Sequence, residues 1–218
     1  MTVVDVEQQP PAMPSPRRRH LRWIAGILIA MLLAAGGFLG FVEYYISTVP
    51  EPGEFRVDHP IVRIEDLPTE VANAFVAAVD PDFYADDAGN VFNTSLITRR
   101  YVLLATQDTE ADESTWRIRI MAGKLQEKYA YAEILGFYLN SADYGRGAVG
   151  LVAAAQAYFG KQPAQLTVAE AALLAVQLHP DRPQPEDGWK QVLDTMVQHG
   201  TLGKAERAAL TFPRARNP

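Results

Sequence analysis

The pattern of apolar positions divides the chain into one long hydrophobic run and a series of shorter amphipathic segments. Residues 23–42 form a run of 20 positions without a charge. At about 1.5 Å of rise per residue, a helix of this length crosses a hydrocarbon core of about 30 Å. The run is longer than the apolar part of a signal peptide and ends in bulky side chains instead of a small-residue cleavage site. It therefore predicts a retained transmembrane helix at 23–42.

After Pro68, apolar residues recur at spacings of three and four, and no segment alternates with a period of two. This pattern predicts an all-α body. A helix is expected to start with Thr69 as its cap and to end at Asp80, before a proline. The other predicted helices start near residue 93 or 94, cover 115–140 and 148–159, start at Thr167, and cover 189–198 and 205–210. Gly160 is expected to end the helix at 148–159.

These boundaries predict five segments. A polar, proline-rich tail at 1–22 is expected to be disordered. The transmembrane helix at 23–42 is followed by a proline-rich linker at 43–66, the helical domain at 67–212 and a short tail at 213–218. Residues 17–22 contain four arginines, and a basic cluster before a spanning helix marks the cytoplasmic side. We therefore expect the N-terminus inside the cell and the domain outside the cytoplasmic membrane.

The charge of the body argues against a nucleic-acid-binding protein. The chain has a net charge of −6, and residues 43–218 carry 16 basic and 24 acidic side chains. Such an acidic body gives no reason to expect contact with a phosphate backbone. The chain has no cysteine, and its four histidines are scattered without metal-ligand spacing. We predict neither a metal nor a cofactor.

The most distinctive stretch lies between residues 134 and 161. It contains YLN at 138–140, YGRGAVG at 144–150 and AAAQAYFGK at 153–161, and LTVAEAALLA follows at 166–175. These runs resemble the second half of the glycosyltransferase family 51 domain, the peptidoglycan transglycosylase domain of class A penicillin-binding proteins and monofunctional transglycosylases. The resemblance extends over about residues 67–210. It implies a lysozyme-like, all-α transglycosylase domain.

The chemistry of that family requires a carboxylate as general base and positive charge near the departing pyrophosphate. The family supplies two glutamates, in an E-D-x-x-F-Y motif and an R-K-x-x-E motif. The first motif resembles V-D-P-D-F-Y at 79–84, where the glutamate position is Val79. The second glutamate falls on Ile118, or on Arg119 if the match shifts by one residue, and residues 114–126 contain no carboxylate. The resemblance therefore predicts a member that lacks both glutamates.

Basic residues near these motifs could still bind the precursor's diphosphate. The family's G-G-S-T-I-T-Q-Q resembles N-T-S-L-I-T-R-R at 93–100, in which two arginines replace the glutamines. Arginine binds phosphate oxygens well, although the pair could equally be a solvated helix face. Around the third motif, Arg117, Arg119 and Lys124 could replace lost positive charge or belong to an ordinary amphipathic turn. The candidate substrate-binding residues are Asp80, Ser95, Thr98, Arg99, Arg100, Arg117, Arg119 and Lys124.

Asp80 is the weak candidate for a surrogate base. On a helix it points roughly 100° away from Val79, and aspartate is one methylene shorter than glutamate. A displacement of about 1 Å can cost a catalytic group about 100-fold in rate. The alternative interpretation is that Asp80 caps a helix or pairs with a nearby arginine.

The leading hypothesis is a membrane-anchored pseudoenzyme of peptidoglycan synthesis. It would bind a lipid-linked precursor or other cell-wall synthesis proteins without polymerising glycan. One alternative is an active glycosyltransferase that uses an aspartate from the 80–87 stretch as a surrogate base. The other is a purely structural membrane protein that keeps the fold for a protein partner.

Overall fold

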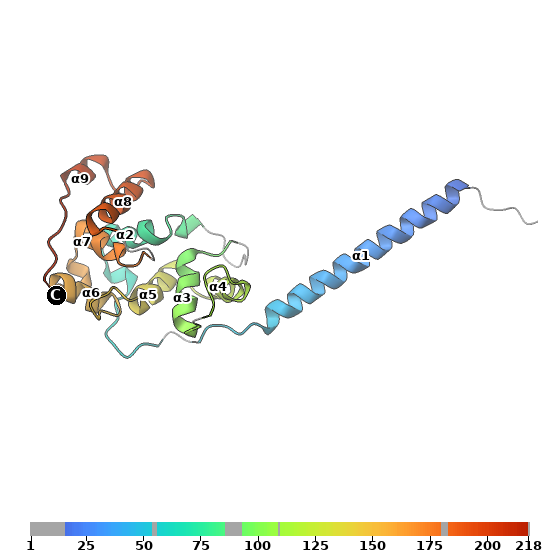
Figure 1. Ribbon diagram of the computed structural model, residues 1–218, viewed down its shortest axis with the longest axis horizontal. Coiled ribbons are helices and arrows are strands. Elements are labelled where there is room, and N and C mark those ends of the chain that lie inside the picture. Colours follow the sequence, from blue (N-terminus) through green and yellow to red (C-terminus); the bar gives the residue numbers. More distant parts are fainter. Residues whose placement is uncertain (1–15, 54–55, 86–92, 109, 180–182, 218) are drawn as a thin grey trace, which may run out of the picture. The chain divides into compact units, whose positions relative to one another are not determined.

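The computed structural model describes residues 16–53, 56–85, 93–108, 110–179 and 183–217 (Figure 1). The chain divides into two compact units, Met1–Thr48 and Val49–Pro218. All the regular elements in the described residues are helices, and one isolated backbone bridge joins Asp143 to Val149. The prediction of an all-α body is confirmed.

The first unit contains the helix α1, Pro16–Thr48. Its segment Trp23–Thr48 has 26 residues and contains an 18-residue window with a mean hydropathy of 2.3, so the segment is long and apolar enough to cross a membrane. Large apolar side chains along it are open to the surroundings, and Leu33 is 73% exposed. The helix continues past the predicted end at residue 42, because residues 43–48 contain no proline or glycine to stop it.

The second unit consists of two groups of packed helices (Figure 1). In the first group, α2, α7 and α8 pack against one another, and α9 lies on α8. In the second group, α3 packs against α4 and α5, while α6 contacts both α5 and α7. The helices are α2 Thr69–Val79, α3 Leu96–Thr106, α4 Trp116–Lys128, α5 Tyr131–Ser141, α6 Leu151–Phe159, α7 Val168–Val176, α8 Pro185–Gln198 and α9 Lys204–Ala209. Short 3₁₀ turns occupy Ile64–Asp66, Phe83–Ala85 and Pro163–Gln165.

The start of α7 shows how local sequence fixes an element of the core. The Glu170 carboxylate accepts a hydrogen bond from the Thr167 amide at 2.9 Å, and the Thr167 hydroxyl accepts one from the Glu170 amide at 3.3 Å. This reciprocal arrangement is the predicted capping box. Lys161 donates to both carboxylate oxygens of Glu170 at 2.7 and 2.8 Å. Gly160, with φ of +67°, ends α6 as predicted.

The predicted long helix over residues 115–140 is wrong, because the chain forms two helices there. Tyr129 and Ala130 are extended, with ψ of 146° and 150°, and they separate α4 from α5. The Glu133 side chain accepts a hydrogen bond from the Ala130 amide at 2.9 Å and so satisfies a free donor at the start of α5. The break allows α4 and α5 each to pack on α3.

Several predicted helix starts also differ from the structure. Thr69 is the first residue of α2, and its cap is Pro68, which offers no side-chain hydrogen bond. α8 begins at Pro185, four residues before the predicted start at 189, because proline suits the first position of a helix. α6 begins only at Leu151, because the preceding residue, Gly150, has φ of +82°.

Gly136 lies inside α5 and gives a stability prediction. A methyl group there would lie 3.5 Å from Ile64 Cγ1, an ordinary contact distance. Gly136→Ala is therefore expected to raise the free energy of unfolding by about 0.5–1 kcal/mol, because glycine loses more backbone entropy on folding. Chemical denaturation measures the change.

Gly150→Ala is the opposite control for that experiment. Its φ is +82°, and a new methyl group would lie 2.8 Å from the Asn140 carbonyl oxygen. This variant should lose at least about 1–3 kcal/mol. A loss in Gly136→Ala comparable to that in Gly150→Ala would contradict the space seen beside Ile64.

Candidate transglycosylase site

Three predicted site residues meet where α2 ends and α3 begins. The Asp80 carboxylate accepts a hydrogen bond from the Leu96 amide at 2.6 Å. The Ser95 hydroxyl accepts one from the Thr98 amide at 2.9 Å and lies 2.8 Å from the Thr98 hydroxyl. Asp80 and Ser95 together satisfy two of the amides that a helix leaves free at its N-terminus. The interpretation of Asp80 as a helix cap agrees with this geometry.

Gln126 of α4 completes this polar cluster, and it was not among the predicted site residues. Its side-chain oxygen accepts from the Ser95 amide at 3.2 Å, and its amide nitrogen donates to the Tyr131 hydroxyl at 3.1 Å. Ser95, Thr98 and Gln126 are all buried. Their mutual hydrogen bonds fix the α2–α3 junction, so their first role in this structure is to hold the scaffold.

Asp80 nevertheless has an altered acidity. Burial raises the pKa of its carboxyl above the usual range, the Leu96 and Ile97 amides and the Arg99 charge counteract this in part, and Asp82 adds to the rise. A raised carboxyl pKa is a property that acid–base catalysts often have. The carboxylate is also tied to the α3 terminus, which limits its freedom to reach a substrate.

The two positions on which the motif resemblance places the family's glutamates are packed into the protein. Val79 is 7% exposed at the end of α2 and belongs to the main core, and Ile118 is 1% exposed in α4. Neither side chain can accept a proton. A carboxylate at either position would lose most of its contact with water, which costs several kcal/mol unless it is paired.

The two adjacent arginines of α3 have different partners. Arg99 donates to the Thr94 carbonyl at 2.5 Å, whereas Arg100 donates to Glu113 at 3.3 Å and to the Leu178 carbonyl at 3.2 Å. Successive residues on a helix point about 100° apart, so the two guanidinium groups cannot form a single clamp through their positions alone.

The basic residues of α4 lie in yet other surroundings. Arg117 is exposed and Arg119 is half-buried. Lys124 donates to the Val49 carbonyl at 2.5 Å, and Lys128 pairs with Glu51 at 2.9 Å. Lys124 therefore holds the start of the linker, a role that the sequence did not indicate.

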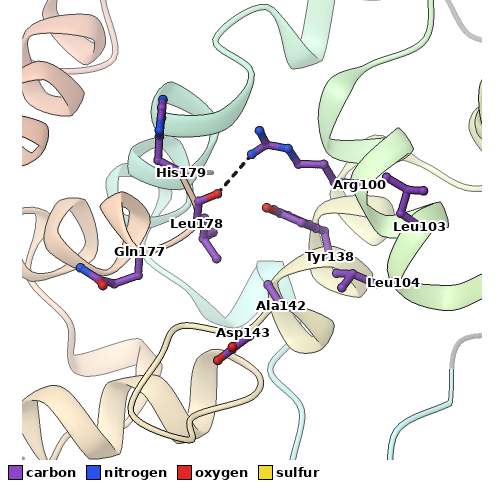
Figure 2. A pocket seen from close by; sticks show the side chains of 9 residues that line it. All are labelled: Arg100, Leu103, Leu104, Tyr138, Ala142, Asp143, Gln177, Leu178 and His179. Atoms are coloured by element: carbon purple, nitrogen blue, oxygen red, sulfur yellow. Dashed lines mark hydrogen bonds between the residues drawn. The ribbon is translucent and has the colours of Figure 1, made fainter. Parts of the chain in front are cut away.

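A pocket of about 380 Å³ lies between the two groups of helices and contains Arg100 (Figure 2). Its walls come from α3, from α5 with the corner after it, and from the segment after α7. The lining residues are Arg100, Leu103, Leu104, Tyr138, Ala142, Asp143, Gln177, Leu178 and His179. Of the eight candidate binding residues, all in the described part of the chain, Arg100 alone lines this pocket.

Tyr138 gives this pocket a neutral hydroxyl beside the guanidinium. Burial raises the pKa of Tyr138, and hydrogen bonding and charge from Arg100 lower it only in part. The phenol therefore stays protonated at neutral pH and can donate a hydrogen bond. Arg100 offers a planar set of N–H groups that suits phosphate or carboxylate oxygens. In the described residues, no group of three His, Asp or Glu side chains is placed to hold a metal ion.

Comparison with known proteins gives the family of this domain. A transglycosylase family model matches residues 92–198. Penicillin-binding protein 1A of Mycolicibacterium smegmatis is 30% identical over 253 aligned positions, which cover 90% of this chain and 32% of the relative. Penicillin-binding protein 1A of Mycobacterium tuberculosis is 32% identical over 204 positions, which cover 79% of this chain and 24% of the relative.

A solved structure, the 2.6 Å crystal structure of penicillin-binding protein 1A from Haemophilus influenzae, is similar with a TM-score of 0.40 and 21% identity, over 77% of this chain and 20% of that one. The chain thus spans less than a third of the length of these relatives, 32% at most. The family match and the two mycobacterial relatives agree with the resemblance found in the motifs. Residues 92–198 match the transglycosylase family.

Proposed function

We propose that this protein is a non-catalytic member of the transglycosylase family that acts in cell-wall synthesis. The observation that carries the proposal is the state of the two glutamate positions. Val79 and Ile118 are apolar and only 7% and 1% exposed, so the site has lost both the base and the space for it. Asp80, the nearest carboxylate along the chain, is bound to the Leu96 amide at 2.6 Å.

We propose that the protein works at the cytoplasmic membrane. The helix α1 is long enough to span it, and the arginines at 17–22 favour an N-terminus inside and a domain outside. The proposed domain organisation has the tail before residue 23, the linker after the spanning helix and the transglycosylase-like domain at 67–212. The partner is either a lipid-linked peptidoglycan precursor or another cell-wall synthesis protein. The position of Arg100 in the pocket favours the precursor.

A polymerisation assay tests the loss of catalysis. The purified full-length protein in detergent, incubated with lipid-linked disaccharide, is expected to give no glycan chains, because neither Val79 nor Ile118 can deprotonate the acceptor hydroxyl. Gel separation of labelled product measures the result. An active family 51 transglycosylase in the same detergent serves as the positive control, and chains made by this protein would contradict the proposal.

Asp80 favours a second candidate, an active enzyme with a surrogate base, because the pKa of its carboxyl is raised. If glycan forms in the assay, Asp80→Asn separates this candidate from contamination. Asparagine keeps an oxygen that can accept from the Leu96 amide but removes the proton acceptor. Product that persists in Asp80→Asn cannot come from this base.

A further inference from the structure

The Arg100 guanidinium is held by a carboxylate that belongs to the protein itself. Arg100 Nε lies 3.3 Å from Glu113 Oε1. The Arg100 side chain is 15% exposed, whereas that of Glu113 is 38% exposed. The basic group of the pocket is thus mostly buried, and its anionic partner sits nearer the solvent.

Glu113 comes from the acidic segment between α3 and α4. Next to it, the Asp112 carboxylate accepts hydrogen bonds from the Ser114 amide at 2.8 Å and the Thr115 amide at 3.1 Å. These bonds position the backbone on either side of Glu113. The Glu113 side chain, by contrast, reaches Arg100 through a single contact at the long end of the hydrogen-bond range.

The remaining contacts aim the guanidinium into the pocket. Arg100 Nη1 donates to the Leu178 carbonyl at 3.2 Å, as Figure 2 shows, and the Tyr138 hydroxyl lies near it. A guanidinium has five N–H donors; the bonds to Glu113 and Leu178 use two of them, and the hydrogen bond to Tyr138 uses a third. The Asp143 carboxylate is drawn well apart from the guanidinium, at the other end of the pocket (Figure 2).

We propose that Arg100 forms an oxyanion site for a phosphate or diphosphate group and that Glu113 is its internal competitor. The inference rests on the proposed function, since it names the group of the precursor that the pocket takes and the contact that controls access. A phosphate oxygen replaces the Glu113 carboxylate at Arg100 Nε and also accepts from the neighbouring N–H groups. Tyr138 donates a further hydrogen bond from its neutral hydroxyl.

The exchange is favourable because the two anions use the guanidinium differently. Glu113 makes one contact, at 3.3 Å, whereas a phosphate can bind two N–H groups of an arginine in parallel. A released Glu113 side chain is already partly exposed and regains water at little cost. The internal carboxylate keeps Arg100 neutralised when the pocket is empty, because a buried charge without a partner is costly.

The test measures inorganic pyrophosphate binding to the full-length protein in detergent by isothermal titration calorimetry at fixed ionic strength. Glu113→Gln is expected to bind at least about tenfold more tightly than the wild type, because a charged competitor is replaced by a neutral amide. Arg100→Gln and the double variant Arg100→Gln/Glu113→Gln are both expected to lose this binding. Tightening by Glu113→Gln that persists in the double variant would overturn the proposal.

Glu110→Gln is the matched control, since it removes the same charge from the same segment and Glu110 is exposed. Equal tightening in Glu110→Gln and Glu113→Gln would mean that only the general charge matters, and this also overturns the proposal. An absence of binding in every variant overturns it as well.

A polyprenyl diphosphate should respond to Glu113→Gln as pyrophosphate does. A response confined to phosphatidylglycerol vesicles overturns the diphosphate assignment. Polymerisation by the wild type would refute the non-catalytic function while leaving these affinities interpretable.

Discussion

Ile118→Glu is expected to lower the free energy of unfolding by about 3–5 kcal/mol at pH 7. Ile118 is 1% exposed in α4, a helix that packs on α3. A site that accommodates isoleucine does not supply a partner for a charge. An introduced carboxylate therefore loses its hydration without a compensating interaction. Urea unfolding of the detergent-solubilised protein, followed by circular dichroism, measures the loss.

The pH dependence of this variant separates a buried charge from simple misfit. Burial raises the pKa of the new carboxyl above the ordinary glutamate value of about 4.3. The unfolded state therefore loses its proton first, and the deficit relative to the wild type grows as pH rises above that value. Below it, the carboxyl is protonated in both states and the deficit is smallest. Unfolding at pH 4 and pH 7 should show this difference.

Arg117→Glu places the same side chain on the exposed neighbour in α4. This control is expected to change the free energy of unfolding by no more than about 0.5 kcal/mol. If Ile118→Glu were as stable as Arg117→Glu at pH 7, position 118 would have to be accessible. The proposal that position 118 has no room for a glutamate would then be wrong.

Restoring two glutamates would meet the same cost of burial. Val79 belongs to the main core at the end of α2, and Asp80 beside it caps α3. Val79→Glu combined with Ile118→Glu would add two carboxylates to two packed helices. We expect this double variant to unfold before it polymerises glycan, because both positions are buried.

The parts of the fold that were predicted from the sequence depend on local chemistry. The Thr167–Glu170 capping box and the Gly160 stop need only residues that are close in the chain. Tyr129 and Ala130 include no proline or glycine, so no helix-breaking residue marks the break in the sequence. The break forms because α4 and α5 pack separately on α3. Local pattern therefore could not distinguish one long helix from two.

The candidate site also combines features that local sequence predicts with features that only tertiary contacts determine. Motif matching found Asp80, Ser95 and Thr98, which the structure brings together through hydrogen bonds. It also placed Arg99 beside Arg100, but helical geometry sends each to a different partner. The Leu178 carbonyl that binds Arg100 lies 78 positions away, and a backbone oxygen leaves no trace in the sequence. Which arginine enters the pocket thus depends on tertiary structure.

Asn140→Leu is expected to lower the free energy of unfolding by about 2–4 kcal/mol. The Asn140 side chain accepts from the Val62 amide at 3.0 Å and donates to the Val62 carbonyl at 2.7 Å. It also donates to the Gly136 carbonyl at 2.8 Å, and it is only 2% exposed. Leucine fills a similar volume but leaves both polar groups of Val62 without this partner. Chemical denaturation measures the global loss.

Hydrogen exchange identifies its cause. If Asn140 is the clamp that attaches the end of the linker to α5, the Val62 amide should lose protection in Asn140→Leu before the amides of α5 do. Asn73→Leu, at a half-buried position of α2, is the matched control and should stay within about 1 kcal/mol of the wild type with Val62 still protected. Equal protection of Val62 in both variants would mean that the linker is held by its other contacts. Since Lys124 and Lys128 hold its beginning at Val49 and Glu51, the linker would then depend on α4 instead of α5.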